Sequence, residues 1–358
     1  MASLDSCLLD LPLTNNTKND IVDQFWGANA VPRRIDYTDI DLRAYWDYYI
    51  EECSHALHDG GRHISARSHR NILEIVQYLK DSLLRDDIKA ALQSNLSVPT
   101  PPNEEKLLDS SIDLAARLLL MIDFGNLQYG FSGRRQLDWD KGCLKDFVNT
   151  YFSVIPTLGH ERVKLDKTFN ALNLGHIAGV EIAWTKNLAD HLRMTDDDTK
   201  VSIFYHASFL KCQSKSSLLP PGLVAETLRT LALLFPQSDP STRKWMLRLC
   251  SSNNLDPNLL HCGHLKTDNR QIEDFTFWHD RLVILKQVFD EARPSTLSQW
   301  WYDRRNGVQW YTFWVAILVL VLTLFFGLVQ CIEGALQLQR TTATPSHQIS
   351  LKLLSRSM

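Results

Sequence analysis

The sequence predicts a mainly α-helical protein, with a helical cytosolic body, a small β element and one C-terminal transmembrane helix. Three observations support this fold class. Residues 310–332, WYTFWVAILVLVLTLFFGLVQCI, contain no charged side chain. Much of the preceding chain repeats apolar residues at three- and four-residue spacing, which is the period of an amphipathic helix. Only two short segments, 180–185 and 200–206, are rich in β-branched and aromatic residues.

The first part of the body divides at a proline cluster. Residues 1–35 are polar and irregular, and we expect them to form a loosely held N-terminal arm. Residues 36–98 form an N-terminal helical region, because apolar residues recur at helical spacing within 39–58, 70–84 and 87–95. The segment 97–102, SVPTPP, stops this pattern and predicts an internal boundary.

Residues 103–292 are predicted to form the main helical domain. Its clearest helix runs from Glu104 to Ile122, with a broad apolar face after an acidic first turn. The two strand candidates form a short hairpin-like element over 180–206. Further helices are expected at 223–235, 241–250 and 273–292.

The C-terminal part of the chain is typical of a membrane anchor. A membrane-proximal amphipathic segment, 295–309, precedes the span 310–332 and a tail, 333–358. At 1.5 Å per residue the span is roughly 34 Å long, which is enough to cross a hydrocarbon core of about 30 Å. A buried core helix is the alternative, but the apolar run from Val315 to Val329 shows no polar face. The span is marked by Trp310, Trp314, Phe325 and Ile332, and an interfacial belt is expected from Trp300, Trp301, Tyr302 and Tyr311.

One face of the span carries small residues at four-residue intervals: Thr323, Gly327, Cys331 and Ala335. Such spacing lets two helix backbones approach closely, so the pattern predicts a homo-oligomer formed through the span. Small residues are also ordinary in membrane helices, and that alternative stays open.

Charge and cysteine usage constrain location and partners. Residues 1–309 hold 35 Lys and Arg against 40 Asp and Glu, so we expect no nucleic-acid partner. Seven cysteines without a C-x-x-C pair fit a reducing compartment. The N-terminus lacks the pattern of a secretory signal, which predicts a cytoplasmic N-terminal body and a single-pass, tail-anchored protein of the endoplasmic reticulum or a similar endomembrane.

No motif identifies a catalytic residue, and we expect no cofactor. The weak candidates for a metal site are His261, His264, His279 and Asp280. His279-Asp280 is a doublet used by metal-dependent phosphohydrolases, but such a site needs a further His and Asp that the sequence does not place.

Three stretches resemble a known family of uncharacterised, membrane-anchored proteins of filamentous fungi. They are residues 180–210, 220–245 and 281–337, and the most specific segments within them are WTKNLADHL and QWWYDRRNGVQWYTFWVAILVL. The resemblance implies a mostly helical body and a single C-terminal membrane span, and it implies no activity. The first hundred residues lie outside it.

Taken together, these features predict a protein-binding or scaffold module at a membrane surface, with the lipid bilayer and a protein as partners. The alternative is a metal-dependent or other enzyme that acts on a membrane-associated substrate.

Overall fold

The computed structural model describes residues 3–27, 40–58, 60–94, 103–125, 137–153, 155–159, 163–213, 217–292, 297–303 and 307–342. The chain divides into two compact units, Met1–Arg293 and Pro294–Met358, which are described separately. The first unit is the body. The second unit contains the apolar C-terminal helix.

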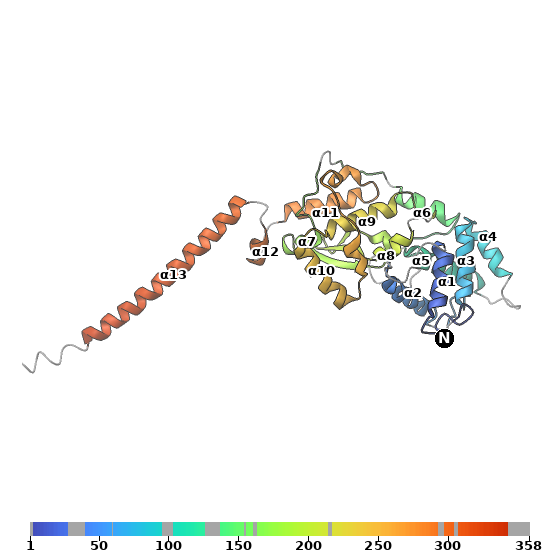
Figure 1. The fold of residues 1–358 in the computed structure, drawn as a ribbon, viewed down its shortest axis with the longest axis horizontal. Helices are drawn as coiled ribbons and strands as arrows, with labels where there is room; N and C mark the ends of the chain where they lie inside the picture. The colour runs from blue at the N-terminus through green and yellow to red at the C-terminus, as the bar shows by residue number, and fades with distance from the viewer. Residues whose placement is uncertain are drawn as a thin grey trace, which may run out of the picture. The chain divides into compact units, whose positions relative to one another are not determined.

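The described part of the body is built mainly from α-helices. Its helices are α1 (Asn15–Trp26), α2 (Arg43–Ala56), α3 (His69–Lys80), α4 (Arg85–Gln93), α5 (Glu104–Leu120), α6 (Leu144–Phe152), α7 (Ala171–His176), α8 (Ala207–Gln213), α9 (Leu223–Leu234), α10 (Pro240–Asn253) and α11 (His279–Glu291). Short 3₁₀ turns, η1 to η4, occupy Leu188–Asp190, Pro257–His261, Thr267–Arg270 and Ile272–Asp274. Figure 1 shows α1 to α5 at one end of the body and α7, α10 and α11 at the other.

Helix α5 is the central element of the N-terminal half. It packs against α2, α3 and α4, and its side chains from Leu114 to Leu120 are all buried. Because the last carbonyls of a helix lack partners within it, neighbouring hydroxyls bind them. Tyr45 Oη donates to Leu118 O at 2.9 Å, and Tyr48 Oη donates to Arg117 O at 3.2 Å.

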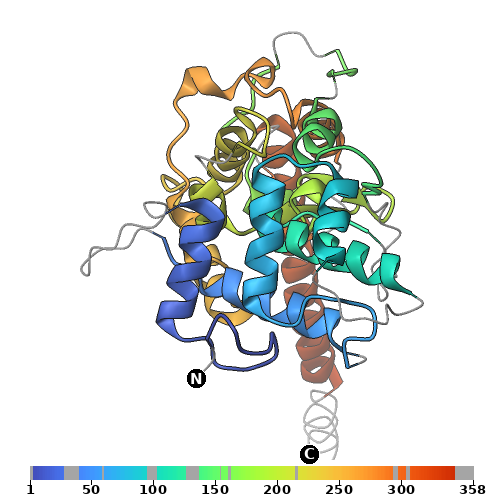
Figure 2. The same cartoon turned by 90° about the vertical axis from the view of Figure 1, so that its right-hand side faces the viewer.

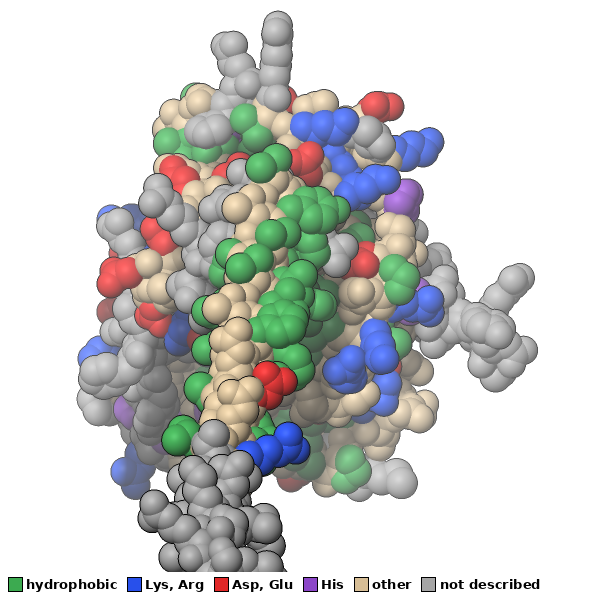
Figure 3. Space-filling model, turned by 90° about the vertical axis from the view of Figure 1, so that its left-hand side faces the viewer, with side chains coloured by type: hydrophobic (Ala, Val, Ile, Leu, Met, Phe, Trp, Pro, Cys, Tyr) green, Lys and Arg blue, Asp and Glu red, His purple; other side chains and the backbone are tan. Residues whose placement is uncertain are grey.

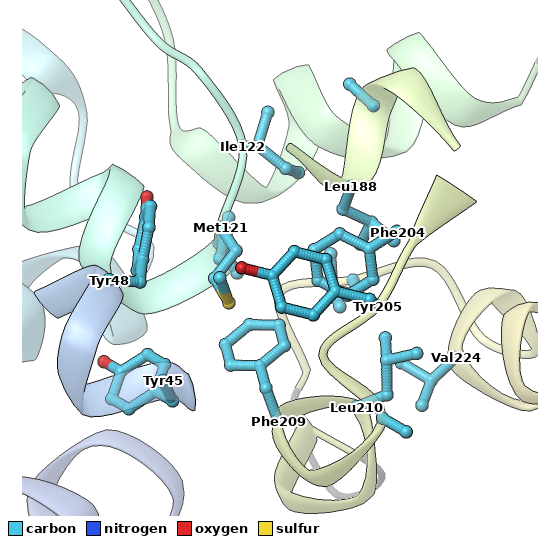
Figure 4. Packing of buried hydrophobic residues seen from close by; sticks show 14 of the residues in the cluster. Tyr45, Tyr48, Met121, Ile122, Leu188, Phe204, Tyr205, Phe209, Leu210 and Val224 are labelled. Atoms are coloured by element: carbon cyan, nitrogen blue, oxygen red, sulfur yellow. The ribbon is translucent and has the colours of Figure 1, made fainter. Parts of the chain in front are cut away.

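A single hydrophobic core extends through the body. Figure 4 shows Tyr45 and Tyr48 of α2 facing Met121, at the end of α5, and the aromatic rings of Phe204 and Phe209. Residues from both sides of the predicted boundary therefore share one core. The boundary itself, 97–102, lies outside the described residues.

The predicted strands are present, but their pairing differs from the expected hairpin. β1 (Glu181–Thr185) pairs with β3 (Lys200–Phe204) in parallel, from Glu181 opposite Lys200 to Thr185 opposite Phe204. β2 (Arg193–Thr195) pairs antiparallel with β3, so the order is β1-β3-β2. The hairpin is therefore the one between β2 and β3.

The turn between β2 and β3 explains why the sequence did not reveal this hairpin. Asp196, Asp197 and Asp198 all have left-handed backbone angles, with φ of 52°, 52° and 62°. Aspartate tolerates this region better than most residues, so three acidic residues reverse the chain without a glycine. The short strand before them was too brief to show an alternation of apolar residues.

The N-terminal arm is also more ordered than expected, because residues 15–26 form α1. The Thr14 side chain caps this helix by accepting from Thr17 N at 3.1 Å. Ile21 and Phe25 are buried one turn apart and face α3, and Figures 1 and 2 show the two helices side by side. The polar first turn conceals this short apolar face in the sequence. The remainder of the arm from residue 28 lies outside the described residues.

The second unit consists of α12 (Leu297–Tyr302) and α13 (Gly307–Thr342). At 36 residues, α13 is about 54 Å long. It contains the predicted span 310–332 and continues into the predicted tail, of which residues 343–358 are not described.

Candidate functional site

The first candidate site is the apolar part of α13, from Trp310 to Arg340. This segment is long and apolar enough to cross a membrane, and its most apolar window has no residue buried against protein. Figure 3 shows hydrophobic side chains along its visible face. Phe325 and Ile332 are both exposed. An isolated helix that presents apolar side chains all round is suited to hydrocarbon rather than to water.

Aromatic residues gather at the start of this helix, as the sequence predicted. Trp301 of α12 packs edge-on against Trp314 of α13, with ring centroids 5.0 Å apart. Tyr302 and Tyr311 are exposed. The side chain of Trp300 lies outside the described residues. This grouping is the arrangement expected where a helix enters a bilayer interface.

The small-residue face of α13 is open. The Thr323 hydroxyl donates to Val319 O of its own helix at 2.8 Å, so its polar group is already satisfied. A Cβ added at Gly327 would meet no atom within 4 Å. Cys331 and Ala335 are exposed. Within the described residues, nothing covers this face.

The metal candidates do not form a metal centre in the described part of the chain. No group of three His, Cys, Asp or Glu side chains that could hold a metal ion occurs among the described residues. His261 and His264 are exposed on the surface. His279 and Asp280 do meet, with 3.0 Å between Nδ1 and Oδ1.

Asp280 instead anchors a loop. Its carboxylate accepts hydrogen bonds from Thr157 N at 2.9 Å, Thr157 Oγ1 at 2.7 Å and Leu158 N at 3.2 Å. Burial alone would raise the pKa of this carboxyl, but the bonds from His279, Thr157 and Leu158 outweigh it and hold the pKa well below its ordinary value. Asp280 is therefore a charged, fully engaged structural group.

The second candidate site is a cavity of about 930 Å³ that opens beside α11 and the edge strand β2. It combines apolar side chains with charges of both signs. Its lining residues are Leu137, Asp138, Tyr151, Leu192, Arg193, Met194, Asp198, Arg281 and Ile284. We refer to it as the α11 cleft.

Arg281 is the best fixed charged group of the α11 cleft. Its Nη1 donates to Ala189 O at 2.8 Å and to His191 O at 2.5 Å, and its guanidinium lies 5.1 Å from the centre of the Trp278 ring. Burial lowers the pKa of Arg281, and the nearby charge of Arg193 lowers it further. Arg193, which also lines the α11 cleft, pairs with Asp190 at 3.0 Å and remains partly exposed.

Exposed apolar side chains lie on α11 and on the loop 155–159 that contacts it. Ile155 is 81% exposed and Leu158 is 38% exposed, on the loop that Asp280 holds. Ile284 follows Asp280 by one helical turn on α11 and is 38% exposed. Apolar side chains on a fixed backbone beside a polar cleft are typical of a protein-binding surface.

Sequence reasoning did not find the α11 cleft. Its residues come from the segment before α6, from α6, from β2 and the residues on either side of it, and from α11, which are brought together only by folding. The doublet His279-Asp280 lies at the start of α11, directly before Arg281 of the cleft, but no metal-binding group of three occurs among the described residues.

The function of this chain has to be argued from its own residues. Comparison with protein-family models, with curated proteins and with solved structures finds no match.

Proposed function

We propose that this protein is a single-pass membrane protein whose body binds a protein partner at the membrane surface. The observation that carries the proposal is the uncovered apolar helix α13. A core helix of a soluble protein would be mostly buried, and a signal sequence would lie near the N-terminus, whereas this segment is unburied and starts at Trp310. The resemblance of residues 281–337 to membrane-anchored fungal proteins agrees with this proposal.

We place the body in the cytosol and the tail across an endomembrane. All seven cysteines are free thiols, from Cys7 to Cys331, which suits a reducing compartment. Within 20 residues on each side of the span, Arg293, Arg304 and Arg305 precede it and Arg340 and Lys352 follow it, and this excess of one positive charge also favours a cytosolic body.

The test is protease protection of intact membranes with a different tag at each terminus, together with carbonate extraction. We expect the N-terminal tag to be digested, the C-terminal tag to be shielded and both to stay in the membrane pellet. Extraction of the full chain by carbonate would overturn the anchor. A protected N-terminal tag would overturn only the orientation.

The partner is proposed to bind at the α11 cleft and its apolar flank. Ile155 is largely exposed while its loop is held by the Asp280 carboxylate, so a partner would meet a preformed surface. An exposed apolar patch gains affinity when a partner buries it, and Arg281 adds a fixed charge for orientation.

Photo-crosslinking in native membranes tests this surface. A photoreactive residue at position 155 is compared with one at position 84, because Leu84 is also exposed, at 52%, but lies at the start of α4. We expect a discrete crosslinked protein from position 155 only, and its loss with Arg281→Ala. The same crosslinks from both positions would refute the proposed surface.

A further inference from the structure

The outer face of α10 carries only positive charge. Its sequence, PSTRKWMLRLCSSN, contains Arg243, Lys244 and Arg248 and no acidic residue. All three side chains are exposed, and none of them is engaged in an ion pair within the described part of the chain. The remainder of the body is acidic, since residues 1–309 have an excess of Asp and Glu.

The packing of α10 keeps these charges together. Thr242 and Met246 are buried on the inner side of the helix. Arg243 and Leu247 are one turn apart on the outer side, as are Lys244 and Arg248. Leu247 is 51% exposed, so the outer side combines three cations with one accessible apolar residue. We call these four residues the α10 face.

The acids nearest to α10 along the chain do not neutralise the α10 face. Asp239 caps the helix, and its carboxylate accepts from Ser241 N at 3.3 Å and Thr242 N at 3.1 Å. Asp256, at the start of η2, is 1% exposed and accepts from Ser208. The exposed Asp47 accepts a hydrogen bond from Asn254, just after the helix ends.

The α10 face belongs to the end of the body from which the chain leaves. Phe289, in the last turn of α11, packs against Phe169 with ring centroids 5.5 Å apart. Phe169 lies two residues before the start of α7, and α7 packs against α10. Figure 1 shows α7, α10 and α11 at the same end of the body.

The linker to the membrane helix is short. The segment 293–309 would span roughly 60 Å even if it were fully extended. Residues 297–302 form α12, and a helix covers less distance per residue than an extended chain, so the actual reach is shorter. A tether of this length limits how far the body can move from a bilayer that holds α13, so the effective concentration of the body at the lipid surface is high. A weak attraction is then enough to orient the body.

We propose that the α10 face docks on the anionic lipid headgroups of the membrane that holds α13. Arginine and lysine bind phosphate and carboxylate groups of headgroups, and Leu247 enters the apolar boundary beneath them. Each basic residue near an anionic surface strengthens association by about fivefold. The inference rests on the anchor in the proposed function, but it adds a specific lipid class and the face that recognises it.

The test uses the full chain in lipid nanodiscs, with hydrogen exchange of the backbone as the readout. Discs of phosphatidylcholine alone are compared with discs that also contain about 30% phosphatidylserine. We expect amide exchange over 240–253 to slow by at least about threefold in the anionic discs, and this protection to disappear in about 0.5 M salt.

Matched variants identify the residues responsible. The triple variant Arg243→Gln, Lys244→Gln, Arg248→Gln should lose the protection. The control triple Arg62→Gln, Lys106→Gln, Lys141→Gln removes the same charge from exposed residues outside α10 and should keep it. Equal protection in both kinds of disc would indicate a contact other than anionic lipid, such as a second copy of the chain, and would overturn the inference.

The outcomes also separate this inference from the anchor. If the protein does not enter the discs, the proposed anchor fails and the inference fails with it. If the protein enters the discs but exchange over 240–253 is unchanged, only the docking of the α10 face is refuted.

Discussion

Thr157 is held by the Asp280 carboxylate through both its backbone N–H and its hydroxyl, at 2.9 Å and 2.7 Å, although the two residues are 123 positions apart. This contact fixes the loop 155–159 on α11. It therefore holds the loop that carries exposed Ile155 on α11, whose residues Arg281 and Ile284 line the α11 cleft, without any secondary structure in the loop itself.

Asp280→Ala should release this loop. Because hydrogen bonds to a charged group contribute about 1.5–3 kcal/mol each in mutational series and are not additive, we expect a loss of roughly 2 kcal/mol in unfolding free energy. Hydrogen exchange over 155–159 should become faster. The matched control is Asp290→Ala on the same helix, which removes a half-exposed carboxylate that pairs only with Lys286 among the described residues and should change stability by less than about 1 kcal/mol. Equal effects of the two variants would contradict the anchoring role of Asp280.

Two buried histidines should respond in opposite ways to replacement by phenylalanine. His191 Nδ1 accepts from Phe204 N at 3.2 Å, and Nε2 lies 2.7 Å from Thr230 Oγ1. His206 is equally buried, yet neither ring nitrogen has a hydrogen-bond partner among the described residues. His191→Phe should lower the unfolding free energy by about 1–3 kcal/mol, since it leaves partners unpaired, whereas His206→Phe should leave it unchanged or raise it. Urea unfolding in detergent micelles measures both, and a similar loss in each variant would be evidence against this assignment.

The same histidines should make the body sensitive to acid. Burial lowers the pKa of both to about 3, helped by the charge of Arg281 at His191 and of Lys186 at His206. In the unfolded chain each titrates near 6.5. The unfolded state therefore binds more protons between these values, so the stability from each neutral histidine is complete above about pH 6.5 and is lost as the pH falls.

Comparison of His206→Phe with the wild type isolates the contribution of one histidine to this pH dependence. Each histidine should contribute a slope of up to about 1.4 kcal/mol per pH unit below pH 6. Asp256 has the opposite pH dependence. Burial raises the pKa of its carboxyl to about 6, so the contribution of Asp256 to the unfolding free energy falls as the pH rises from about 4. Between pH 7 and pH 4, His206→Phe should make the fall in unfolding free energy less steep, because one fewer proton is taken up on unfolding. An unchanged slope would mean that His206 titrates normally.

Local signals in the sequence predicted much of the fold. Glu104–Ile122 was expected as a helix, and α5 occupies Glu104–Leu120, because a long apolar face leaves little choice of structure. The two strand segments were also correctly placed. The parallel pairing of β1 with β3 was not predictable, since strand direction depends on where the intervening chain packs.

The two candidate sites also differ in how far the sequence alone reveals them. The span depends on composition along one continuous segment, so the sequence reveals it directly. The α11 cleft depends on Tyr151, Arg193 and Arg281, which are far apart in sequence and have no shared motif. His279 and Asp280 illustrate the limit, because the sequence shows the doublet but not the backbone groups of Thr157 and Leu158 that occupy the carboxylate.

Self-association through α13 is the last prediction. Thr323, Gly327, Cys331 and Ala335 form a face on which no side chain would obstruct a second helix at Gly327. In hydrocarbon, helices associate through close packing of such faces rather than through the hydrophobic effect. Gly327→Leu should therefore abolish association in a membrane two-helix reporter assay, because the added side chain separates the backbones. Phe325→Leu introduces the same residue on roughly the opposite side of the helix and should have little effect. If both variants associate as strongly as the wild type, the small residues are ordinary components of the span and association does not depend on them.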